Sequence, residues 1–158
     1  MAKIVLIGAG SVVFAKTLIG DILSFPALAQ GSLSLVDINA PRLDLVAAYT
    51  RRLITEQGLS TQLEVTTDRR RALHGADYVI TVIQVGGARA YEMVMRIPRR
   101  YGIDQAVGDT IGPGGVFRGL RSIPVLREIC RDMEALCPRA WLLNYTNPLA
   151  INVRGVFS

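Results

Sequence analysis

The stretch KIVLIGAGSVVF, at residues 3–14, decides the fold of this chain. Residues 3–7 are one lysine followed by four apolar residues, which is the pattern of a parallel β-strand that is covered on both faces. A glycine turn follows at once, in which Gly8 permits a tight bend and Gly10 removes the Cβ that would block a pyrophosphate. A helix beginning near Ser11 would point its free N–H groups at that anion. The stretch therefore predicts the turn of a dinucleotide-binding domain.

An acidic residue closes the second apolar run, where such domains place a ribose-binding acid. A carboxylate at Asp37 would accept hydrogen bonds from ribose hydroxyls and repel a 2′-phosphate, which favours NAD over NADP. The alternative for Asp37 is a solvent-exposed acid that begins a turn. Val13 stands where the usual pattern has its third glycine. The predicted cofactor contacts are Gly8, Gly10, Ser11, Val12, Phe14 and Asp37.

Strand and helix patterns alternate along the rest of the chain. The predicted strands are residues 3–7, 33–36, 63–66, 78–85 and 141–145, and the predicted helices are 12–24, 41–58, 68–73 and 117–137. The first helix is expected to pack through Val13, Leu18, Ile22 and Phe25. This alternation predicts an α/β fold with a Rossmann-type, doubly wound parallel sheet, and residues 1–158 as one NAD-binding domain. Such a sheet usually has about six strands, so we expect truncation before a C-terminal domain.

Composition narrows the class of protein. The 158 residues are 50% hydrophobic and 20% charged, which argues against disorder. No apolar run approaches the roughly 18 residues of a membrane span, and the first strand leads directly into a turn, unlike a signal peptide. We therefore expect a soluble, cytoplasmic protein. The net charge of +5 comes largely from arginines in separate elements without stacking aromatics, which favours solvated surface charge over nucleic-acid binding.

Three further segments are expected at the carboxyl edge of the sheet, where open parallel sheets bind ligands. They are residues 85–87, 108–115 and 144–148. The glycines of the middle segment would let backbone approach a ligand, and Asp109 would place a carboxylate at the mouth of the site. Asn147 offers both a donor and an acceptor, as a sugar hydroxyl or a nicotinamide amide needs. Turn chemistry could explain each loop alone, but together the three favour a binding site.

These motifs resemble those of the NAD- and manganese-dependent glycoside hydrolases of family 4, which include α-galactosidases and α-glucosidases. The resemblance covers essentially the whole chain and rests on residues 8–11, 109–115, 118–121 and 146–148. Lactate and malate dehydrogenases share the first motif and a similar Asn-Pro, but they lack the Gly-Pro-Gly-Gly sequence at 112–115. The resemblance implies an enzyme that hydrolyses O-glycosyl bonds in carbohydrate metabolism.

The chemistry implied by this resemblance differs from two-carboxylate glycoside hydrolysis. In the family, NAD transiently oxidises the C3 hydroxyl, and the ketone acidifies the C2 proton, which a base removes beside a divalent metal such as Mn²⁺. The aglycone is eliminated, water adds, and the hydride returns. By resemblance, Gly8, Gly10, Ser11 and Asp37 match the cofactor site, Asn147 matches the substrate-binding asparagine, and Asp109 matches an acidic position that tunes the catalytic tyrosine base.

The resemblance also bears on the substrate. Relatives that act on 6-phosphorylated sugars have an arginine after the fourth strand and a glutamate at the Asp109 position. We align Tyr91 with that arginine, although Arg89 lies only two residues away. We therefore expect a small, unphosphorylated α-galactoside or α-glucoside as the substrate.

The metal ligands, the catalytic acid and the tyrosine base of the family all lie beyond residue 158 in this alignment. We therefore expect no metal ligand in this chain, NAD binding at most, no hydrolysis by the chain alone, and a homo-oligomer in full-length relatives. Cys130 and Cys137 are expected to be reduced, packed thiols, and His74 a surface or capping residue. Two alternatives stay open, a fragment of a 2-hydroxy-acid dehydrogenase and a non-catalytic nucleotide-binding module.

Overall fold

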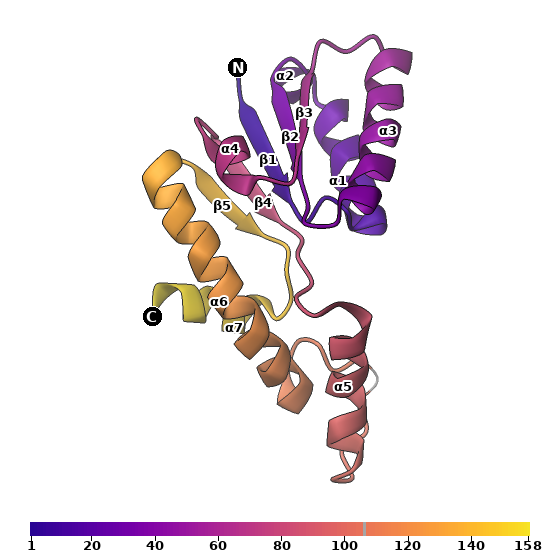
Figure 1. Cartoon of the computed structure of the whole chain (residues 1–158), viewed down its shortest axis with the longest axis vertical. Coiled ribbons are helices and arrows are strands. Elements are labelled where there is room, and N and C mark those ends of the chain that lie inside the picture. Colours follow the sequence, from indigo (N-terminus) through magenta and orange to yellow (C-terminus); the bar gives the residue numbers. More distant parts are fainter. Residues whose placement is uncertain (106) are drawn as a thin grey trace. The chain divides into compact units, whose positions relative to one another are not determined.

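A five-stranded sheet with the strand order β3-β2-β1-β4-β5 forms the centre of the fold (Figure 1). The computed structural model describes residues 1–105 and 107–158. The strands are β1 (Lys3–Ile7), β2 (Ser32–Val36), β3 (Gln62–Thr66), β4 (Tyr78–Thr81) and β5 (Trp141–Asn144). Strand β1 pairs in parallel with β2 and with β4, and β2 pairs in parallel with β3. The chain thus winds outward to one side of β1 and then to the other, which confirms the predicted doubly wound sheet.

The described residues form seven helices, of which α1 to α6 lie between strands and α7 follows the last strand. They are α1 (Val12–Ser24), α2 (Pro26–Ala29), α3 (Ala40–Glu56), α4 (Arg69–Leu73), α5 (Gly87–Arg99), α6 (Gly112–Leu136) and α7 (Leu149–Phe157). The sequence predicts α1, α3, α4 and α6, and it misses α2, α5 and α7. Helix α6 begins at Gly112 rather than Phe117, because Pro113 is tolerated in a first turn whose N–H groups lack helical partners.

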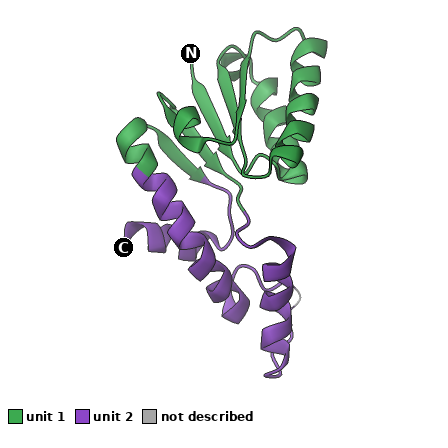
Figure 2. Cartoon of the chain, viewed as in Figure 1, with its two compact units in different colours: residues 1–83, 132–143 green, residues 84–131, 144–158 purple. Residues whose placement is uncertain are grey.

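The chain divides into two compact units (Figure 2). Unit 1 comprises residues 1–83 and 132–143, and unit 2 comprises residues 84–131 and 144–158. The sheet and helices α1 to α4 lie in unit 1, whereas α5, α7 and most of α6 lie in unit 2. That residues 1–158 form a single domain stays a prediction.

Helix α1 packs on the sheet through a different face from the one predicted. Ile22 is buried and Leu18 packs against the core, as expected. The prediction is wrong for Val13 and Phe25, which are 75% and 60% exposed. The buried residues of α1 are Ala15, Ile19, Ile22 and Leu23. These four residues lie on one narrow face of the helix, which packs against the strands. Val13 lies on the opposite, solvent-exposed face of the first turn.

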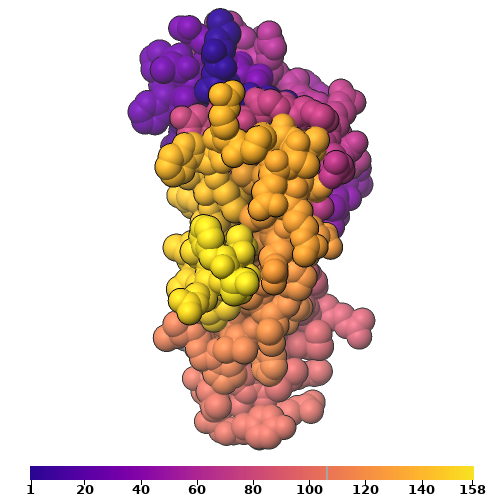
Figure 3. Space-filling model, turned by 90° about the vertical axis from the view of Figure 1, so that its left-hand side faces the viewer, coloured from indigo at the N-terminus to yellow at the C-terminus, as the bar shows by residue number. Residues whose placement is uncertain are grey.

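Helices α6 and α7 of unit 2 lie side by side, as the orange and yellow segments of Figure 3 show. Glycines permit this approach. A Cβ on Gly119 of α6 would lie 2.5 Å from Cγ2 of Ile151, and a Cβ on Gly155 of α7 would lie 2.5 Å from Cδ1 of Ile123. At each of these two contacts, a glycine of one helix therefore packs against an isoleucine side chain of the other helix.

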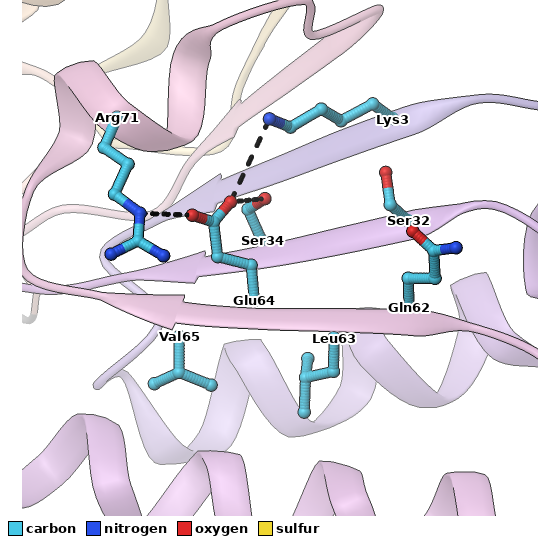
Figure 4. A pocket seen from close by; sticks show the side chains of 8 residues that line it. All are labelled: Lys3, Ser32, Ser34, Gln62, Leu63, Glu64, Val65 and Arg71. Atoms are coloured by element: carbon cyan, nitrogen blue, oxygen red, sulfur yellow. Dashed lines mark hydrogen bonds and ion pairs between the residues drawn. The ribbon is translucent and has the colours of Figure 1, made fainter.

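One face of β2 and β3 is polar, which is unusual for a covered parallel sheet (Figure 4). Glu64 accepts a hydrogen bond from Oγ of Ser34 at 2.8 Å and forms ion pairs with Nε of Arg71 at 3.0 Å and Nζ of Lys3 at 3.9 Å. A hollow of about 470 Å³ lies here, lined by Lys3, Ser32, Ser34, Gln62, Leu63, Glu64, Val65 and Arg71. Its charged groups pair with one another, so the cluster covers the polar face of the sheet.

Asp132 joins the end of α6 to α4 within unit 1. Its carboxylate accepts hydrogen bonds from Nε of Arg69 at 2.7 Å and from Nη1 of Arg70, and the residue is 8% exposed. Burial raises the pKa of Asp132, but the hydrogen bonds and charges of Arg69 and Arg70 outweigh this effect and hold the pKa below its ordinary range. The ionised carboxylate therefore stabilises the folded state.

We expect Asp132→Asn to lower the free energy of unfolding at pH 7 by about 1–2 kcal/mol, because the partly buried Arg69 and the exposed Arg70 lose their shared counter-charge. The folded-state pKa lies below the unfolded one. The stabilisation is therefore present at neutral pH and declines as the pH falls below about 4. Urea unfolding of both proteins from pH 7 to pH 3 measures the difference. The control is Glu56→Gln, which removes the exposed ion pair with Arg52, and no measurable change is expected. Coincident curves at pH 7 would contradict the prediction.

Candidate functional site

The glycine turn lies where strands β1, β2 and β4 end, at the point where the strand order reverses. Gly8 has a φ of +93°, and its N–H donates to the carbonyl of Val36 at 2.8 Å. A Cβ on Gly8 would lie 2.7 Å from the carbonyl oxygen of Val82, so only glycine fits this turn. Open parallel sheets bind ligands at this position, as the sequence predicts.

Asp37 and Gly10 contact each other across the turn. Oδ2 of Asp37 accepts a hydrogen bond from the Gly10 N–H at 2.8 Å, and Oδ1 accepts one from the Asn39 N–H at 2.7 Å. A Cβ on Gly10 would lie 2.8 Å from Oδ2 of Asp37. The carboxylate thus holds the turn in place, and each of its oxygens retains a lone pair for a further donor.

The first turn of α1 is open to an anion. Its N-cap residue, Ser11, makes no side-chain capping hydrogen bond, and the first turn contains no acidic residue. Val12, Val13 and Phe14 are 50%, 75% and 58% exposed, so their side chains do not cover the helix end. Unpaired N–H groups at a helix N-terminus, beside a glycine without a Cβ, fit a pyrophosphate group.

A second cluster, in unit 2, brings together residues that are far apart in the sequence. Oδ2 of Asp109 accepts a hydrogen bond from Nη1 of Arg118 at 2.8 Å and from Nδ2 of Asn147 at 3.4 Å. The Asp109 and Arg118 side chains are only 18% and 16% exposed. Asp109 and Asn147 thus lie together as the sequence suggests, whereas the ion pair of Arg118 with Asp109 becomes apparent only in the structure.

The glycines at the start of α6 are explained by contacts within the chain. A Cβ on Gly114 would lie 2.1 Å from the carbonyl oxygen of Gly108, and a Cβ on Gly115 would lie 2.7 Å from the carbonyl carbon of Thr110. The sequence alone suggested that these glycines let the backbone approach a ligand. In the structure, the two glycines are approached by the backbone of the preceding loop.

Helix α5 carries Tyr91 and Arg89 after the turn at Gly86, which has a φ of +86°. The hydroxyl of Tyr91 donates to the carbonyl of Val107 at 3.4 Å, and Arg89 is exposed. The sequence prediction misses this helix, although its buried residues, Ala90, Val94 and Pro98, follow helical spacing. The proline near its end and the two glycines before it obscured that signal.

Among residues 1–105 and 107–158, no three His, Cys, Asp or Glu side chains gather as a metal site would require. Neither cysteine forms a disulfide within the described residues, and Cys137 is buried whereas Cys130 is partly buried. Burial raises the pKa of the Cys137 thiol against the attraction of Lys3, as expected of a packed thiol. His74 is an exposed C-cap residue of α4, which confirms its predicted role. Within the described part of the chain, no helix is long and apolar enough to span a membrane.

A comparison of the sequence with protein families places these two clusters in context. The sequence profile of the family 4 glycosyl hydrolases matches residues 3–157. The chain belongs to this family.

Other family 4 proteins resemble the chain over nearly all of its length. It is 46% identical to an α-galactosidase of Bacillus subtilis (strain 168) and 45% identical to an α-galactosidase of Rhizobium meliloti (strain 1021), with 95% of this chain covered in each case. The chain spans 35% and 31% of those two proteins, about a third of their length.

The fold of the chain also matches solved structures of family 4 enzymes. A 6-phospho-α-glucosidase from gut microorganisms, in complex with NAD and glucose-6-phosphate, matches with a TM-score of 0.86 and 28% identity, over 97% of this chain and 34% of that one. Malate dehydrogenase from Plasmodium falciparum matches at 16% identity with a TM-score of 0.63, over 99% of this chain and 41% of that one, and shares only the fold. The chain is thus a member of family 4 that shares its fold with the dehydrogenases.

Proposed function

We propose that residues 1–158 are the NAD-binding portion of a family 4 glycosidase that acts by oxidation, elimination and addition. The observation that carries this proposal is the Gly8–Gly10 turn, held by Asp37 beside the uncapped α1. Two similar family members are α-galactosidases, and NAD is bound in a similar family 4 structure. A fragment with only a structural role would not need an open, anion-binding helix end.

In this proposal, Asp37 accepts hydrogen bonds from the ribose hydroxyls, and its charge excludes a 2′-phosphate. Gly10 and Ser11 give the pyrophosphate access to the backbone, and the N–H groups of Val12 and Phe14 bind it. When bound, NAD would supply the acceptor for a hydride from the sugar carbon that bears the hydroxyl, and its reduced form would supply the donor for the reverse transfer. The chain itself contributes binding and orientation, so correct placement of the cofactor is its main task.

The sugar is proposed to bind at the cluster in unit 2. Asn147 would hydrogen-bond a sugar hydroxyl. The negative charge of the Asp109 carboxylate would tune the basicity of the family's catalytic tyrosine. The neutral phenol of Tyr91, where phosphate-specific relatives place an arginine, favours an unphosphorylated α-galactoside or α-glucoside.

A similar structure, of a 6-phospho-β-glucosidase from Thermotoga maritima, contains manganese. The described residues of this chain contain no cluster of His, Cys, Asp or Glu side chains that could hold a metal ion. We also propose a cytoplasmic location and a homo-oligomer of the full-length protein.

Calorimetric titration of the chain with NAD and with NADP tests the cofactor proposal. We expect NAD to bind at least tenfold more tightly than NADP. Asp37→Asn is expected to weaken NAD binding about tenfold and to remove most of the discrimination, because it removes the charge that repels a 2′-phosphate. Asp44→Asn, which neutralises an exposed acid on α3, is the matched control. If folded wild-type chain does not bind NAD, the proposed function is wrong.

Sugar specificity is tested with NAD-saturated chain. The alignment leads us to expect NAD binding at most, but Asp109 and Asn147 lie together within unit 2, so we propose that the chain also binds a sugar. Methyl α-galactoside or methyl α-glucoside is expected to bind more tightly than glucose 6-phosphate, since a phenol cannot pair with the phosphate dianion. Titration by ¹⁵N–¹H nuclear magnetic resonance measures all three affinities on one sample. Tighter binding of glucose 6-phosphate would contradict the unphosphorylated substrate and point to Arg89 as the phosphate ligand.

A further inference from the structure

The carboxylate of Asp109 receives three hydrogen bonds from three different residues. Oδ1 accepts one from Oγ1 of Thr110 at 3.0 Å, while Oδ2 accepts those from Arg118 and Asn147. Asp109 and Arg118 are both more than four-fifths buried, so solvent screens their attraction weakly. The ion pair is therefore a fixed element of unit 2, whereas Thr110 and Asn147 are the exposed members of the group.

The charge of Asp109 determines which way the Asn147 amide faces. An ionised carboxylate can only accept hydrogen bonds, whereas an amide has a donor NH₂ and an acceptor oxygen at its two ends. If the amide were turned over, two acceptor oxygens would face each other at this contact. The NH₂ group therefore faces Asp109, and Oδ1 of Asn147 is left to accept a hydrogen bond from a ligand.

This orientation depends on Arg118. Without its guanidinium group, the mostly buried Asp109 carboxylate would lack a counter-charge, and would either turn toward solvent or take up a proton. Either change removes the acceptor that directs the Asn147 amide. Besides any effect on the catalytic base, the Asp109 carboxylate thus has a direct effect on the Asn147 amide, which it contacts.

We propose that Arg118 is a positioning residue. It acts through Asp109 to present Oδ1 of Asn147 as the acceptor for a sugar hydroxyl. This proposal rests on the proposed function in that it takes the ligand to be a sugar. It adds a residue to the site, and it specifies that the ligand group at Asn147 is a hydrogen-bond donor.

The test compares Arg118→Met and Arg118→Lys in the ¹⁵N-labelled chain. In the wild type, we expect the side-chain NH₂ resonances of Asn147, assigned from the spectrum of Asn147→Asp, to show slowed hydrogen exchange. Arg118→Met is expected to move these resonances toward those of a free amide and to weaken methyl α-galactoside binding about tenfold in the presence of NAD. Arg118→Lys restores the charge and is expected to recover most of both signals. Arg127→Met, an exposed arginine of α6, is the matched control and is expected to change neither.

Five outcomes of these measurements decide whether the proposal holds. Unchanged Asn147 resonances and sugar affinity in folded Arg118→Met would overturn the proposal, as would failure of the wild type to bind methyl α-galactoside with NAD bound. If Arg118→Met fails to fold, Asp109→Asn takes its place and must cause the same two losses, or the proposal is overturned. If the wild type does not bind NAD, the proposed function fails, whereas the Asn147 resonances still report whether Arg118 orients the amide. Unaltered NAD affinity in Arg118→Met, together with the expected losses, supports the proposal.

Discussion

Gly10→Ala is expected to weaken NAD binding about 100-fold while the sheet remains folded. The new Cβ would lie 2.8 Å from Oδ2 of Asp37 and 3.1 Å from Cβ of Arg42, and the former is closer than real Cβ contacts allow. The Asp37 carboxylate must therefore move and lose its hydrogen bond to the Gly10 N–H. The pyrophosphate can then no longer approach the backbone at residue 10, and the Asp37 carboxylate no longer lies where it would accept hydrogen bonds from the ribose. Two such losses, each of about 1–1.5 kcal/mol, correspond to a factor of about 100.

Calorimetry with NAD and thermal unfolding together measure this effect. Gly20→Ala is the matched control, because Gly20 lies in α1 and a Cβ there would meet no atom within 4 Å. The control is expected to retain NAD affinity and to gain up to about 1 kcal/mol of stability, since alanine is the better helix former. NAD affinity of Gly10→Ala within twofold of the wild type would show that the turn does not hold the cofactor.

Gly114→Ala is expected to destabilise unit 2 by about 3 kcal/mol. Its Cβ would lie 2.1 Å from the carbonyl oxygen of Gly108 and 2.8 Å from Cγ1 of Val94, so the first turn of α6 must separate from the loop and from α5. Overpacking against side chains typically costs 1–3 kcal/mol, and a backbone carbonyl yields less readily than a side chain. The loop that carries Asp109 is displaced as a result.

Hydrogen exchange of individual amides tests this second prediction. Protection in α5 and in residues 112–131 of α6 is expected to fall, whereas protection in β1, β2 and α1 of unit 1 is expected to stay close to that of the wild type. Gly20→Ala again controls for the glycine-to-alanine change. Wild-type protection throughout unit 2 would mean that the close approach at Gly114 is not required.

Local sequence patterns predict some elements of this chain better than others. Strand β1 and helix α1 occur at the predicted residues, because an apolar run, a glycine turn and helical spacing follow one another directly. Helix α5 was missed because glycines precede it and Pro98 interrupts it. The face of α1 was also misjudged. Val13 is apolar and has helical spacing, but the sheet covers only the stripe through Ala15 and Ile19.

The glycine turn, the acid after β2 and the family of the chain are all determined by the sequence itself. These features depend on residues that are close together or on motifs at known spacing, so their chemistry can be read without coordinates. Only the tertiary structure decided that Asp37 holds Gly10, that Gly114 is required by the chain's own backbone, and that Asp109 accepts hydrogen bonds from both Arg118 and Asn147. Each of these contacts depends on where separate elements come to lie in the folded chain. Packing and the direction of each side chain set those positions, and no local pattern encodes them.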